Sequence, residues 1–458
     1  MHDLLAARSQ MAMSLGFHII FAVVGIGMPL LMVLAESRWL RTGDAMYLEL
    51  ARRWARGTAI LFAVGAVSGT VLSFELGLLW PQFMAFAGPV IGMPFSLEGF
   101  AFFTEAIFLG IYLYGWDRVP ARTHLLAGVA VAVSGAASAV FVVIANAWMN
   151  TPAGFELTAG RVTAVRPLAA LGNPAAFQQT LHMVIAAYVG TGFAVAGIHA
   201  FLLRRDPSNA FHRRALTLAL MVGAPAAVLQ PISGDVSARA VAHQQPAKLA
   251  ALEGLFETTR GAPLTLGGLP DEDARTMRFG IRVPYALSLL AFHDPHAEVR
   301  GLDRIPRDDW PPVAIVHLAF QVMVALGTGL AVLSLWIGWR AWRRREIVGS
   351  RPLLTAIAVA TPCGFLAIEA GWVVTEVGRQ PWIVYEHMKV ADAATSNPGV
   401  WSTFLAVVLL YLAVGITTIL VLRGMSRRFR TARAFTDDDT PYGPSARLVR
   451  PDQEEALR

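Results

Sequence analysis

Two glutamates, seven residues apart, lie inside an apolar stretch that is long enough to cross a membrane. The stretch FSLEGFAFFTEAIFLGIYLYGW runs from Phe95 to Trp116 and carries Glu98 and Glu105. Seven residues are about two turns of a helix, so both carboxyl groups lie on one face. Each costs about 2.5–3.5 kcal/mol near the middle of a bilayer on insertion scales. Because burial favours the neutral form of a carboxyl group, this pair is suited to carry protons.

Other apolar stretches contain imidazole, thioether and carboxyl groups. These are His18, His182, His199, His317, Met323 and Glu376. Neutral imidazole and thioether sulfur are both good axial ligands of heme iron, and a His/Met pair closes both axial positions. A heme with a single protein ligand keeps one position open for oxygen. The sequence has no CxxCH motif, so any heme is expected to be bound non-covalently.

Each of these residues also has a purely structural interpretation. A lone histidine at the end of a span is more often an interfacial residue than a ligand, and Met323 by itself fits simple packing. Transporters and channels use intramembrane glutamates as readily as redox enzymes do. The residues alone therefore leave open a heme-bearing oxidoreductase and a proton-coupled transporter. The transporter predicts a pair of broken helices in related halves, which the sequence does not suggest.

The composition is that of a membrane protein with many spans. The 458 residues are 55% hydrophobic and only 15% charged, with a mean hydropathy of +0.51. The net charge of +6 is not gathered on a soluble module, which argues against a nucleic-acid partner. The single cysteine, Cys363, excludes a disulfide framework and a cysteine metal cluster. The first residues, MHDLLAARSQ, lack the features of a signal peptide, so we expect the first apolar segment to be retained.

Apolar stretches of about 20 residues predict an all-α fold with nine transmembrane helices. They lie near 12–35, 56–79, 94–116, 123–149, 178–203, 214–232, 312–339, 352–376 and 400–422. Arginines cluster in every second connection, at 38–56, 204–214, 340–351 and 423–433. The positive-inside rule then places the N-terminus outside and the C-terminus in the cytoplasm, which agrees with an odd number of spans.

These spans divide the chain into four regions. They are residues 1–230 with six helices, an external connection at 231–311, three helices at 312–422, and a polar cytoplasmic tail at 423–458. The external connection alternates charges with apolar runs, so we expect it to be ordered. Helix directions place His18, His182, Met323 and Glu376 in the outer half, beside this connection. Glu98 lies near the outer face on the same basis, with Glu105 about two turns deeper.

Longer segments resemble subunit I of the cytochrome bd-type quinol oxidases. In chain order they are ARSQMAMSLGFHIIF, FSLEGFAFFTEAIFLGIYLYGWDR, VIANAWMNTP, QTLHMVIAAYVGTG, KLAALEGLFET, IRVPYALSLL, HLAFQVMVALG and AIEAGWVVTEVGRQPW. The segments extend to about residue 422, and their order across nine spans is highly specific. The family fold has nine spans and an external quinol-binding loop, which agrees with the topology inferred from the arginines. The loop lacks the insertion that some members carry after PYAL.

The resemblance implies a heme-bearing quinol:oxygen oxidoreductase subunit in a bacterial inner or plasma membrane. His182 and Met323 match the axial pair of a low-spin b heme. His18 and Glu376 match ligands of two high-spin hemes, one b-type and one d-type, and which residue serves which iron stays open. The chain is also similar to cyanide-insensitive relatives that hold a b heme in place of heme d, so the third heme's type stays open too. The implied partners are a second subunit of similar size and, in some members, small single-span subunits.

Further roles are implied by position. Glu98 matches a carboxylate beside the high-spin hemes and Glu105 one in a proton path, while Ser138 and Asn146 fall near that path or the hemes. Lys248 and Glu253 match quinol-loop positions. The remaining matches are Trp372 between hemes, Arg379 near heme propionates, and Gln321 where some members carry arginine near the low-spin heme.

Together these assignments predict quinol oxidation at the outer face and reduction of oxygen to water with cytoplasmic protons. The protons travel through Glu105 and Glu98, and charge separation follows without pumping. Whether the quinol is ubiquinol or menaquinol stays open. The alternative function is a proton-coupled transporter that uses Glu98 and Glu105 as its coupling site.

Overall fold

The computed structural model describes residues 2–344 and 350–430. Within these ranges, nine helical spans are long and apolar enough to cross a membrane. The predicted number of spans and the helical fold class are thereby confirmed. Residues 431–458 of the predicted tail lie outside the described ranges.

Eight of the spans are single helices. They are α1 (His2–Thr42), α2 (Ala45–Leu79), α3 (Pro81–Tyr114), α4 (Ala121–Asn150), α6 (Ala176–Leu203), α7 (Ala210–Gln244), α10 (Val313–Arg344) and α14 (Val400–Arg430). The eighth span along the chain consists of α11 (Arg351–Val359) and α12 (Cys363–Val377), separated by a turn at 360–362. Among the described spans this is the one broken helix. The pair of broken helices that a transporter predicts is therefore not found in the described residues.

Several helices extend beyond the predicted spans because prolines do not end them. Helix α3 begins at Pro81 and continues through Pro89 and Pro94. Helix α7 likewise passes Pro225 and Pro231 and ends at Gln244, beyond the predicted end near residue 232. Proline removes one backbone hydrogen bond, which favours a helix end in water. Within a packed membrane bundle, neighbouring groups satisfy the freed carbonyl, and the helix continues.

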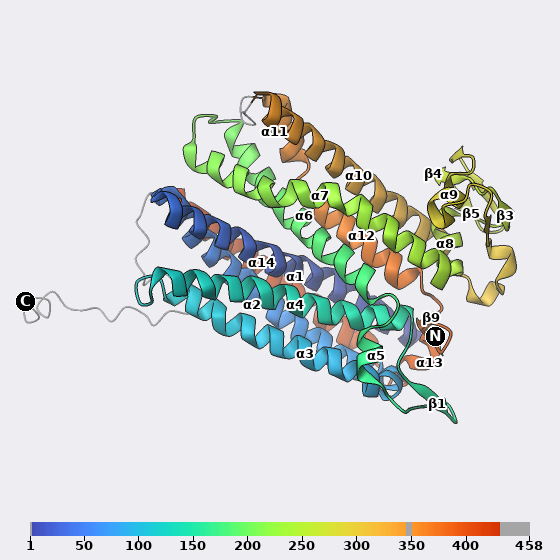
Figure 1. Ribbon diagram of the computed structural model, residues 1–458. Coiled ribbons are helices and arrows are strands. Elements are labelled where there is room, and N and C mark those ends of the chain that lie inside the picture. Colours follow the sequence, from blue (N-terminus) through green and yellow to red (C-terminus); the bar gives the residue numbers. More distant parts are fainter. Residues whose placement is uncertain (1, 345–349, 431–458) are drawn as a thin grey trace, which may run out of the picture.

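The spans form two groups of four helices. Helices α1, α2, α3 and α4 pack around one another, and α6, α7, α10 and α12 form the second group. Contacts of α6 with α1 and α4 join the groups, and α14 packs on α1 and α2. The long helices run side by side, and the N-terminus lies at the same end as the connection between α7 and α10 (Figure 1).

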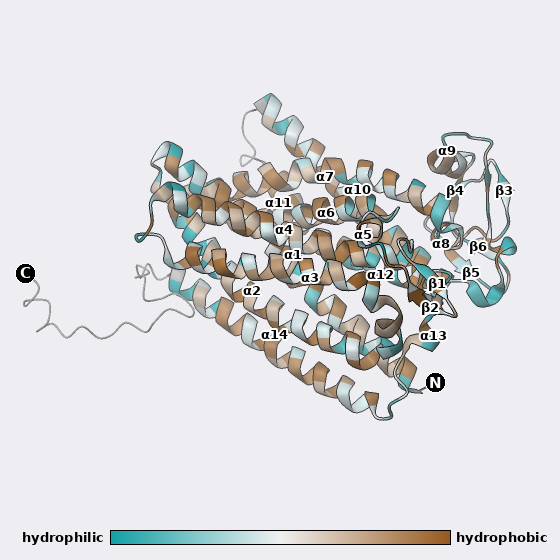
Figure 2. Cartoon of the chain, turned by 60° about the horizontal axis from the view of Figure 1, so that its bottom comes forward, coloured by the Kyte–Doolittle hydropathy of each residue, from teal (hydrophilic) through white to brown (hydrophobic). Residues whose placement is uncertain are grey.

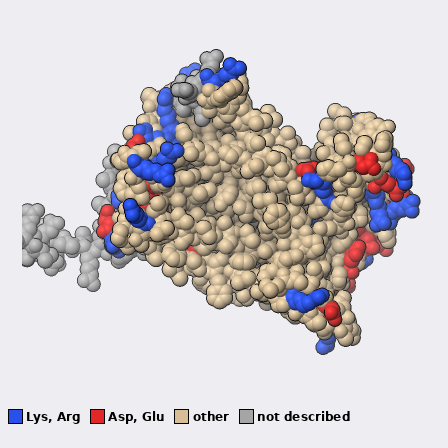
Figure 3. Space-filling model, in the orientation of Figure 1, with Lys and Arg blue, Asp and Glu red and all other residues tan. Residues whose placement is uncertain are grey.

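The polarity of the residues changes from the middle of the helices to their ends. Apolar residues dominate the middle of the bundle, whereas hydrophilic residues gather at its two ends and in the connection after α7 (Figure 2). On the face shown in Figure 3, charged side chains also lie at the ends, with a broad uncharged band between them. This distribution is the one expected for a protein that spans a bilayer.

The connection between α7 and α10 is ordered, as predicted. It contains α8 (Pro246–Glu253), β3 (Thr259–Arg260), β4 (Leu264–Leu266), β5 (Leu269–Asp271), β6 (Thr276–Arg278), β7 (Ile281–Val283), α9 (Ala286–Phe292), β8 (Glu298–Val299) and the 3-10 turns η1 (Leu302–Arg304) and η2 (Arg307–Asp309). Three antiparallel pairs form, β3 with β8, β4 with β7, and β5 with β6. Buried Phe256 and Leu302 pack with Val313 and Val316, so the connection shares a core with the start of α10.

Two shorter connections lie at the same end of the bundle (Figure 1). One contains β1 (Glu156–Thr158), β2 (Arg161–Thr163) and α5 (Pro167–Leu171). The other contains β9 (Trp382–Val384), β10 (Met388–Lys389) and α13 (Val390–Ala393). Together with the longer connection they cover the helix ends that carry most of the candidate site.

The close approach of α6 and α7 depends on two facing glycines. A Cβ atom on Gly192 would lie 2.6 Å from the Cα of Gly223. We expect Gly192→Leu to push the helices apart at a cost of about 1–3 kcal/mol, seen as a lower unfolding temperature of the purified protein. Gly88→Ala is the matched control, because a Cβ there meets no atom within 4 Å. Equal unfolding temperatures for the two variants would contradict this account of the packing.

Candidate functional site

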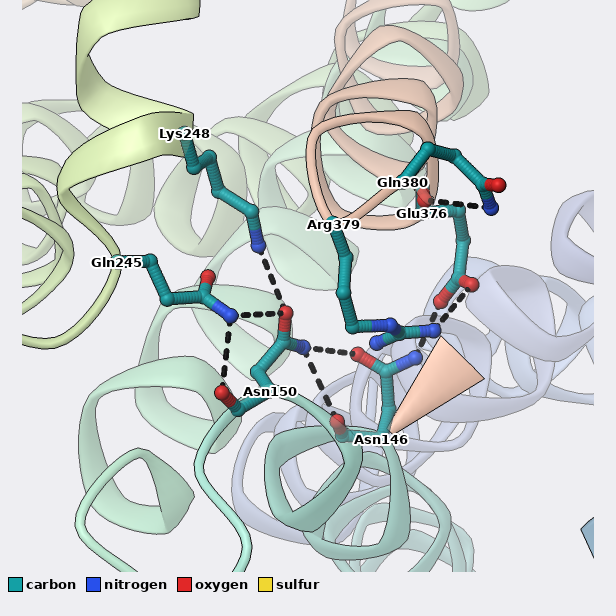
Figure 4. A network of polar contacts seen from close by, with 7 residues as sticks. All are labelled: Asn146, Asn150, Gln245, Lys248, Glu376, Arg379 and Gln380. Carbon is teal, nitrogen blue, oxygen red and sulfur yellow. Dashed lines mark hydrogen bonds and ion pairs between the residues drawn. The ribbon is translucent and has the colours of Figure 1, made fainter. Parts of the chain in front are cut away.

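A buried network joins α8 to the end of α4, and Asn150 stands at its centre (Figure 4). The Nζ of Lys248 donates to the Oδ1 of Asn150 at 2.7 Å. The side-chain amide of Gln245 donates to the backbone oxygen of Asn150 at 2.8 Å. Asn150 itself donates to the backbone oxygen of Asn146, one turn earlier, at 3.0 Å. The last residues of α4 therefore hold the first turn of α8 against the bundle.

The same network continues to the end of α12. The Nδ2 of Asn146 donates to one carboxylate oxygen of Glu376. The Nη2 of Arg379 donates to the other at 2.8 Å, and the amide of Gln380 lies 3.5 Å from the backbone oxygen of Glu376. Asn146 thus lies between the α8 half of the network and the Glu376–Arg379 ion pair.

Lys248 is buried, with 3% of its surface exposed. Burial holds its pKa well below the ordinary value, the nearby Arg379 guanidinium lowers it further, and Glu376 acts in the opposite direction. A Cβ on Gly378 would lie 3.2 Å from the Cε of Lys248, so this glycine leaves room for the lysine stem. The amine is therefore held inside the protein, where burial disfavours its charged form.

Glu253, the last residue of α8, is also buried, with 4% of its surface exposed. Its Oε2 has no hydrogen-bond partner among the described residues. Burial raises the pKa of this carboxyl group to about 7, against a smaller opposite effect of the Thr265 backbone. Glu253 therefore exchanges a proton near neutral pH.

His182 and Met323 belong to the second helix group. The Nδ1 of His182 lies 3.0 Å from the hydroxyl of Ser233 on α7, and its Nε2 lies 3.0 Å from the amide nitrogen of Gln230. The sulfur of Met323 on α10 points at Gly371 of α12, where a Cβ would lie 3.1 Å from it. The four helices that carry these residues pack around one another, so both side chains face the same group.

His18 and the two glutamates of α3 belong to the first helix group. The Nδ1 of His18 lies 2.9 Å from the hydroxyl of Ser68 on α2. Glu105 is buried against Gly135 of α4, where a Cβ would lie 3.1 Å from its carboxyl group. Glu98 is half-buried two turns away on α3. Ser138, also half-buried, is on α4, close in sequence to Gly135.

The described residues contain no group of three or more histidine, cysteine, aspartate or glutamate side chains that could hold a bare metal ion. A heme needs fewer protein ligands, because its macrocycle already coordinates the iron. Arg379 is 2% exposed, and its Nε and Nη1 have no partner among the described residues. A buried guanidinium with two unpaired donors suits the carboxylate of a heme propionate. The donors present therefore fit heme better than a metal ion alone.

A family model described as cytochrome bd terminal oxidase subunit I matches residues 6–429. The chain belongs to this family. It is therefore subunit I of a terminal oxidase and a multi-pass membrane protein, and as a cytochrome it carries hemes. Family membership also decides between the two functions that the residues left open, against the proton-coupled transporter.

Individual members of the bd oxidase family are similar over nearly their whole length. A protein of Bacillus subtilis (strain 168), provisionally named cytochrome bd menaquinol oxidase subunit I, is 38% identical over 92% of this chain and 96% of its own. The cytochrome bd ubiquinol oxidase subunit 1 of the same organism is 32% identical over 91% and 92%. A chain of the bd oxidase structure from Geobacillus thermodenitrificans is 41% identical, with a TM-score of 0.88 over 93% of this chain and 98% of that one.

Three further residues singled out in the sequence have partners outside the network described above. His317 binds the α7–α10 connection, with Nδ1 2.7 Å from the Leu252 oxygen and Nε2 3.1 Å from the Gly267 oxygen. Gln321 also binds this connection, accepting from the Gly267 backbone nitrogen at 2.9 Å. His199 lies near the opposite end of α6 and pairs with His212, Nδ1 to Nδ1, at 2.9 Å.

The structure also reveals carboxylates that the sequence reasoning missed. Glu369 is on α12 beside Gly16 of α1, and its Oε1 is buried without a partner among the described residues. Glu369 precedes Glu376 by seven residues, the same two-turn spacing as the α3 pair, so that signal was available. Half-buried Trp372 lies between them on α12 and packs on an apolar cluster that includes Ile19 and Val23. Glu75, buried on α2, accepts from Gln10 at 2.9 Å and from Ser14 at 2.8 Å.

Proposed function

We propose that this subunit oxidises quinol at the end of the bundle that carries the α7–α10 connection and passes the electrons to oxygen. The observation that carries the proposal is the buried network from Lys248 through Asn150 and Asn146 to Glu376 and Arg379. It links the external connection directly to the residues that suit heme. The relatives named as menaquinol and ubiquinol oxidase subunits support a quinol as the electron donor.

The end that carries the N-terminus and this connection is proposed to be extracytoplasmic. The arginine-rich segments 38–56 and 204–214, with Arg340, Arg343 and Arg351, lie at the other end of the helices. Positive charge concentrates on the cytoplasmic side of membrane proteins, which supports this orientation. Protons released from quinol then leave on the outside, and protons for water come from the cytoplasm.

The residues of α8 are proposed to handle the proton chemistry of quinol. Glu253 exchanges a proton near neutral pH and accepts one from the quinol hydroxyl. Lys248 donates a hydrogen bond to Asn150 and keeps α8 fixed against α4 and α12. Because Lys248 is turned into the protein, we assign it to positioning the loop helix rather than to direct contact with quinol.

Heme ligands are proposed from both helix groups. His182 and Met323 hold a low-spin b heme, and His18 and Glu376 hold the two high-spin hemes. Arg379 would pair with a heme propionate, Trp372 would pack against the hemes, and Gln321 would take the place of an arginine near the low-spin heme. The third heme is a d heme or a further b heme. When bound, these groups accept the electrons of quinol and reduce oxygen to water.

Cytoplasmic protons are proposed to reach the oxygen site along α3 and α4. Glu105 is buried against Gly135, and Glu98 lies two turns nearer the external side on the same face. Each carboxyl group can accept a proton from below and release it above without becoming a lasting buried charge. Ser138 on α4 lies beside this path. Charge separation then follows from the direction of proton uptake, without a pump.

A second subunit of similar size, and small single-span subunits in addition, are proposed as partners. Only 11% of the apolar window of α14 and 17% of that of α10 are buried within this chain. These helices therefore present wide apolar faces to lipid or to another membrane subunit.

Replacing His182 tests the low-spin heme assignment. His182→Ala removes the proposed imidazole ligand, so the reduced-minus-oxidised spectrum of the assembled oxidase is expected to lose its low-spin b heme band. His296→Ala, which changes an exposed histidine of the connection, is expected to leave the spectrum unchanged. A normal low-spin band in His182→Ala would refute the assignment.

Glu105→Gln tests the proton path. The amide cannot take up and release a proton, so oxygen consumption with excess quinol is expected to fall by about 100-fold or more. Heme content, measured as pyridine hemochrome, is expected to stay at the wild-type level. Thr104→Ala, at the neighbouring exposed position, serves as the control. Wild-type turnover in Glu105→Gln would remove this residue from the path.

The raised pKa of Glu253 predicts a pH dependence of quinol oxidation. Below about pH 7 its carboxyl group is protonated and cannot accept a proton, and above that pH it can. We therefore expect kcat/KM for quinol to rise through about pH 7 and Glu253→Gln to abolish the rise. Glu257→Gln changes an exposed glutamate of the same connection and should keep it. An unchanged inflection in Glu253→Gln would show that another group sets it.

A further inference from the structure

The chain contains three Ser-Gly dipeptides, and each one faces a side chain of the proposed redox chemistry. They are Ser68-Gly69 on α2, Ser134-Gly135 on α4 and Ser233-Gly234 on α7. A Cβ on the glycine would lie 3.1 Å from the Cε1 of His18, 3.1 Å from the Glu105 carboxyl group and 3.5 Å from the Cε1 of His182, respectively. The missing side chain makes room for each of these groups.

In two of the three pairs the serine also binds the histidine. The Ser68 hydroxyl lies 2.9 Å from the Nδ1 of His18, and the Ser233 hydroxyl lies 3.0 Å from the Nδ1 of His182. The same hydroxyls lie 3.0 Å from the Val64 oxygen and 2.9 Å from the Gln230 oxygen, on their own helices. The match is between unrelated helices, α1 with α2 and α6 with α7.

The direction of these hydrogen bonds follows from the carbonyl groups. A carbonyl oxygen can only accept, and we assign the single proton of each serine to the backbone oxygen of its own helix. The serine oxygen then accepts from the histidine, and Nδ1 must carry the proton. A neutral imidazole has one proton, which leaves Nε2 with a free lone pair.

Gln230 lies against the same imidazole. Its amide nitrogen lies 3.0 Å from the Nε2 of His182 and 3.3 Å from the Nδ1. The shorter contact places a donor at Nε2, the ring nitrogen that the Nδ1–H tautomer leaves with a lone pair.

We propose that Ser68-Gly69 and Ser233-Gly234 are positioning pairs that prepare His18 and His182 to bind heme iron through Nε2. The serine fixes the tautomer and the ring plane, and the glycine lets the ring approach the neighbouring helix. The inference rests on the proposed function, in which these two histidines are heme ligands. Ser134 donates to the Ala130 oxygen at 2.6 Å and lies beside a carboxyl group, so that dipeptide has only the spacing role.

The expected effect concerns how strongly the imidazole donates to iron. A hydrogen bond from Nδ1–H raises the basicity of the ligand, and loss of such partners lowers metal affinity by about 10–100-fold. Ferric iron depends more on this donation than ferrous iron. Removing the serine oxygen therefore raises the midpoint potential of the heme. The rise is about 59 mV for each tenfold loss of affinity for ferric iron relative to ferrous iron.

The test uses the complete oxidase in membranes and a spectroelectrochemical titration of each heme. Ser233→Ala is expected to raise the potential of the low-spin heme alone, and Ser68→Ala that of one high-spin heme alone. Ser237→Ala and Ser73→Ala are matched controls, since these hydroxyls bind backbone oxygens on the same helices at 3.0 Å. Potentials that coincide with those of the controls would overturn the inference.

Two further pairs of variants keep the test decisive if an alanine variant does not assemble. Threonine and valine have nearly the same shape, but only threonine keeps the acceptor oxygen. Ser233→Thr is expected to retain the wild-type potential and Ser233→Val to lose it, and equal behaviour of the two contradicts the proposal. Gly69→Ala places a Cβ 3.1 Å from His18, and Gly234→Ala places one 3.5 Å from His182. The closer contact is expected to shift the potential of the His18 heme more than Gly234→Ala shifts that of the His182 heme.

The outcome separates this inference from the proposed function. Loss of the low-spin band in His182→Ala together with an unchanged potential in Ser233→Ala leaves the ligand assignment intact and rejects only the positioning role. A low-spin band that survives His182→Ala rejects the assignment itself.

Discussion

The hydrogen bond from Lys248 to Asn150 is the contact on which the end of the molecule that carries the α7–α10 connection depends. An amine buried this deeply is stable only if it gives up its charge or finds partners, because desolvation of an ammonium group is costly. Asn150 offers an oxygen to the lysine and a nitrogen to Asn146, so one neutral side chain joins the loop helix to α4 and, through Asn146, to Glu376. The α7–α10 connection is thus bound to the bundle by polar contacts as well as by its shared apolar core.

The network joins the two helix groups, because Asn146 is on α4 and Glu376 is on α12. His18, Glu98 and Glu105 belong to the first group, whereas His182, Met323 and Glu376 belong to the second. Helix α12 lies at the boundary, since Glu369 reaches Gly16 of α1 and Gly371 lies beside Met323 of α10. In the proposed function the low-spin heme ligands His182 and Met323 come from the second group, and α12 carries Glu376 beside both groups.

The sequence predicted the features that depend on local pattern and missed those that depend on packing between helices. Apolar length determines a membrane span, so the number of spans was confirmed, whereas helix ends were wrong at Pro94 and Pro231 because proline is tolerated inside the bundle. Family segments indicated Lys248, but not that its amine turns inwards. The partners Ser68 and Ser233 are 50 and 51 residues from their histidines, and no local pattern connects them.

The break in the eighth span has a mechanical consequence. In an unbroken helix the hydrogen-bond ladder transmits an axial displacement from one membrane leaflet to the other with little loss. The turn at 360–362 interrupts that ladder where α6 comes close, with the backbone nitrogen of Gly190 only 3.1 Å from the Cβ position of Gly364. The joint therefore lies between α11 and the carboxylates of α12, and the packing of α12 on α1, α6 and α10 sets the depth of Glu369 and Glu376.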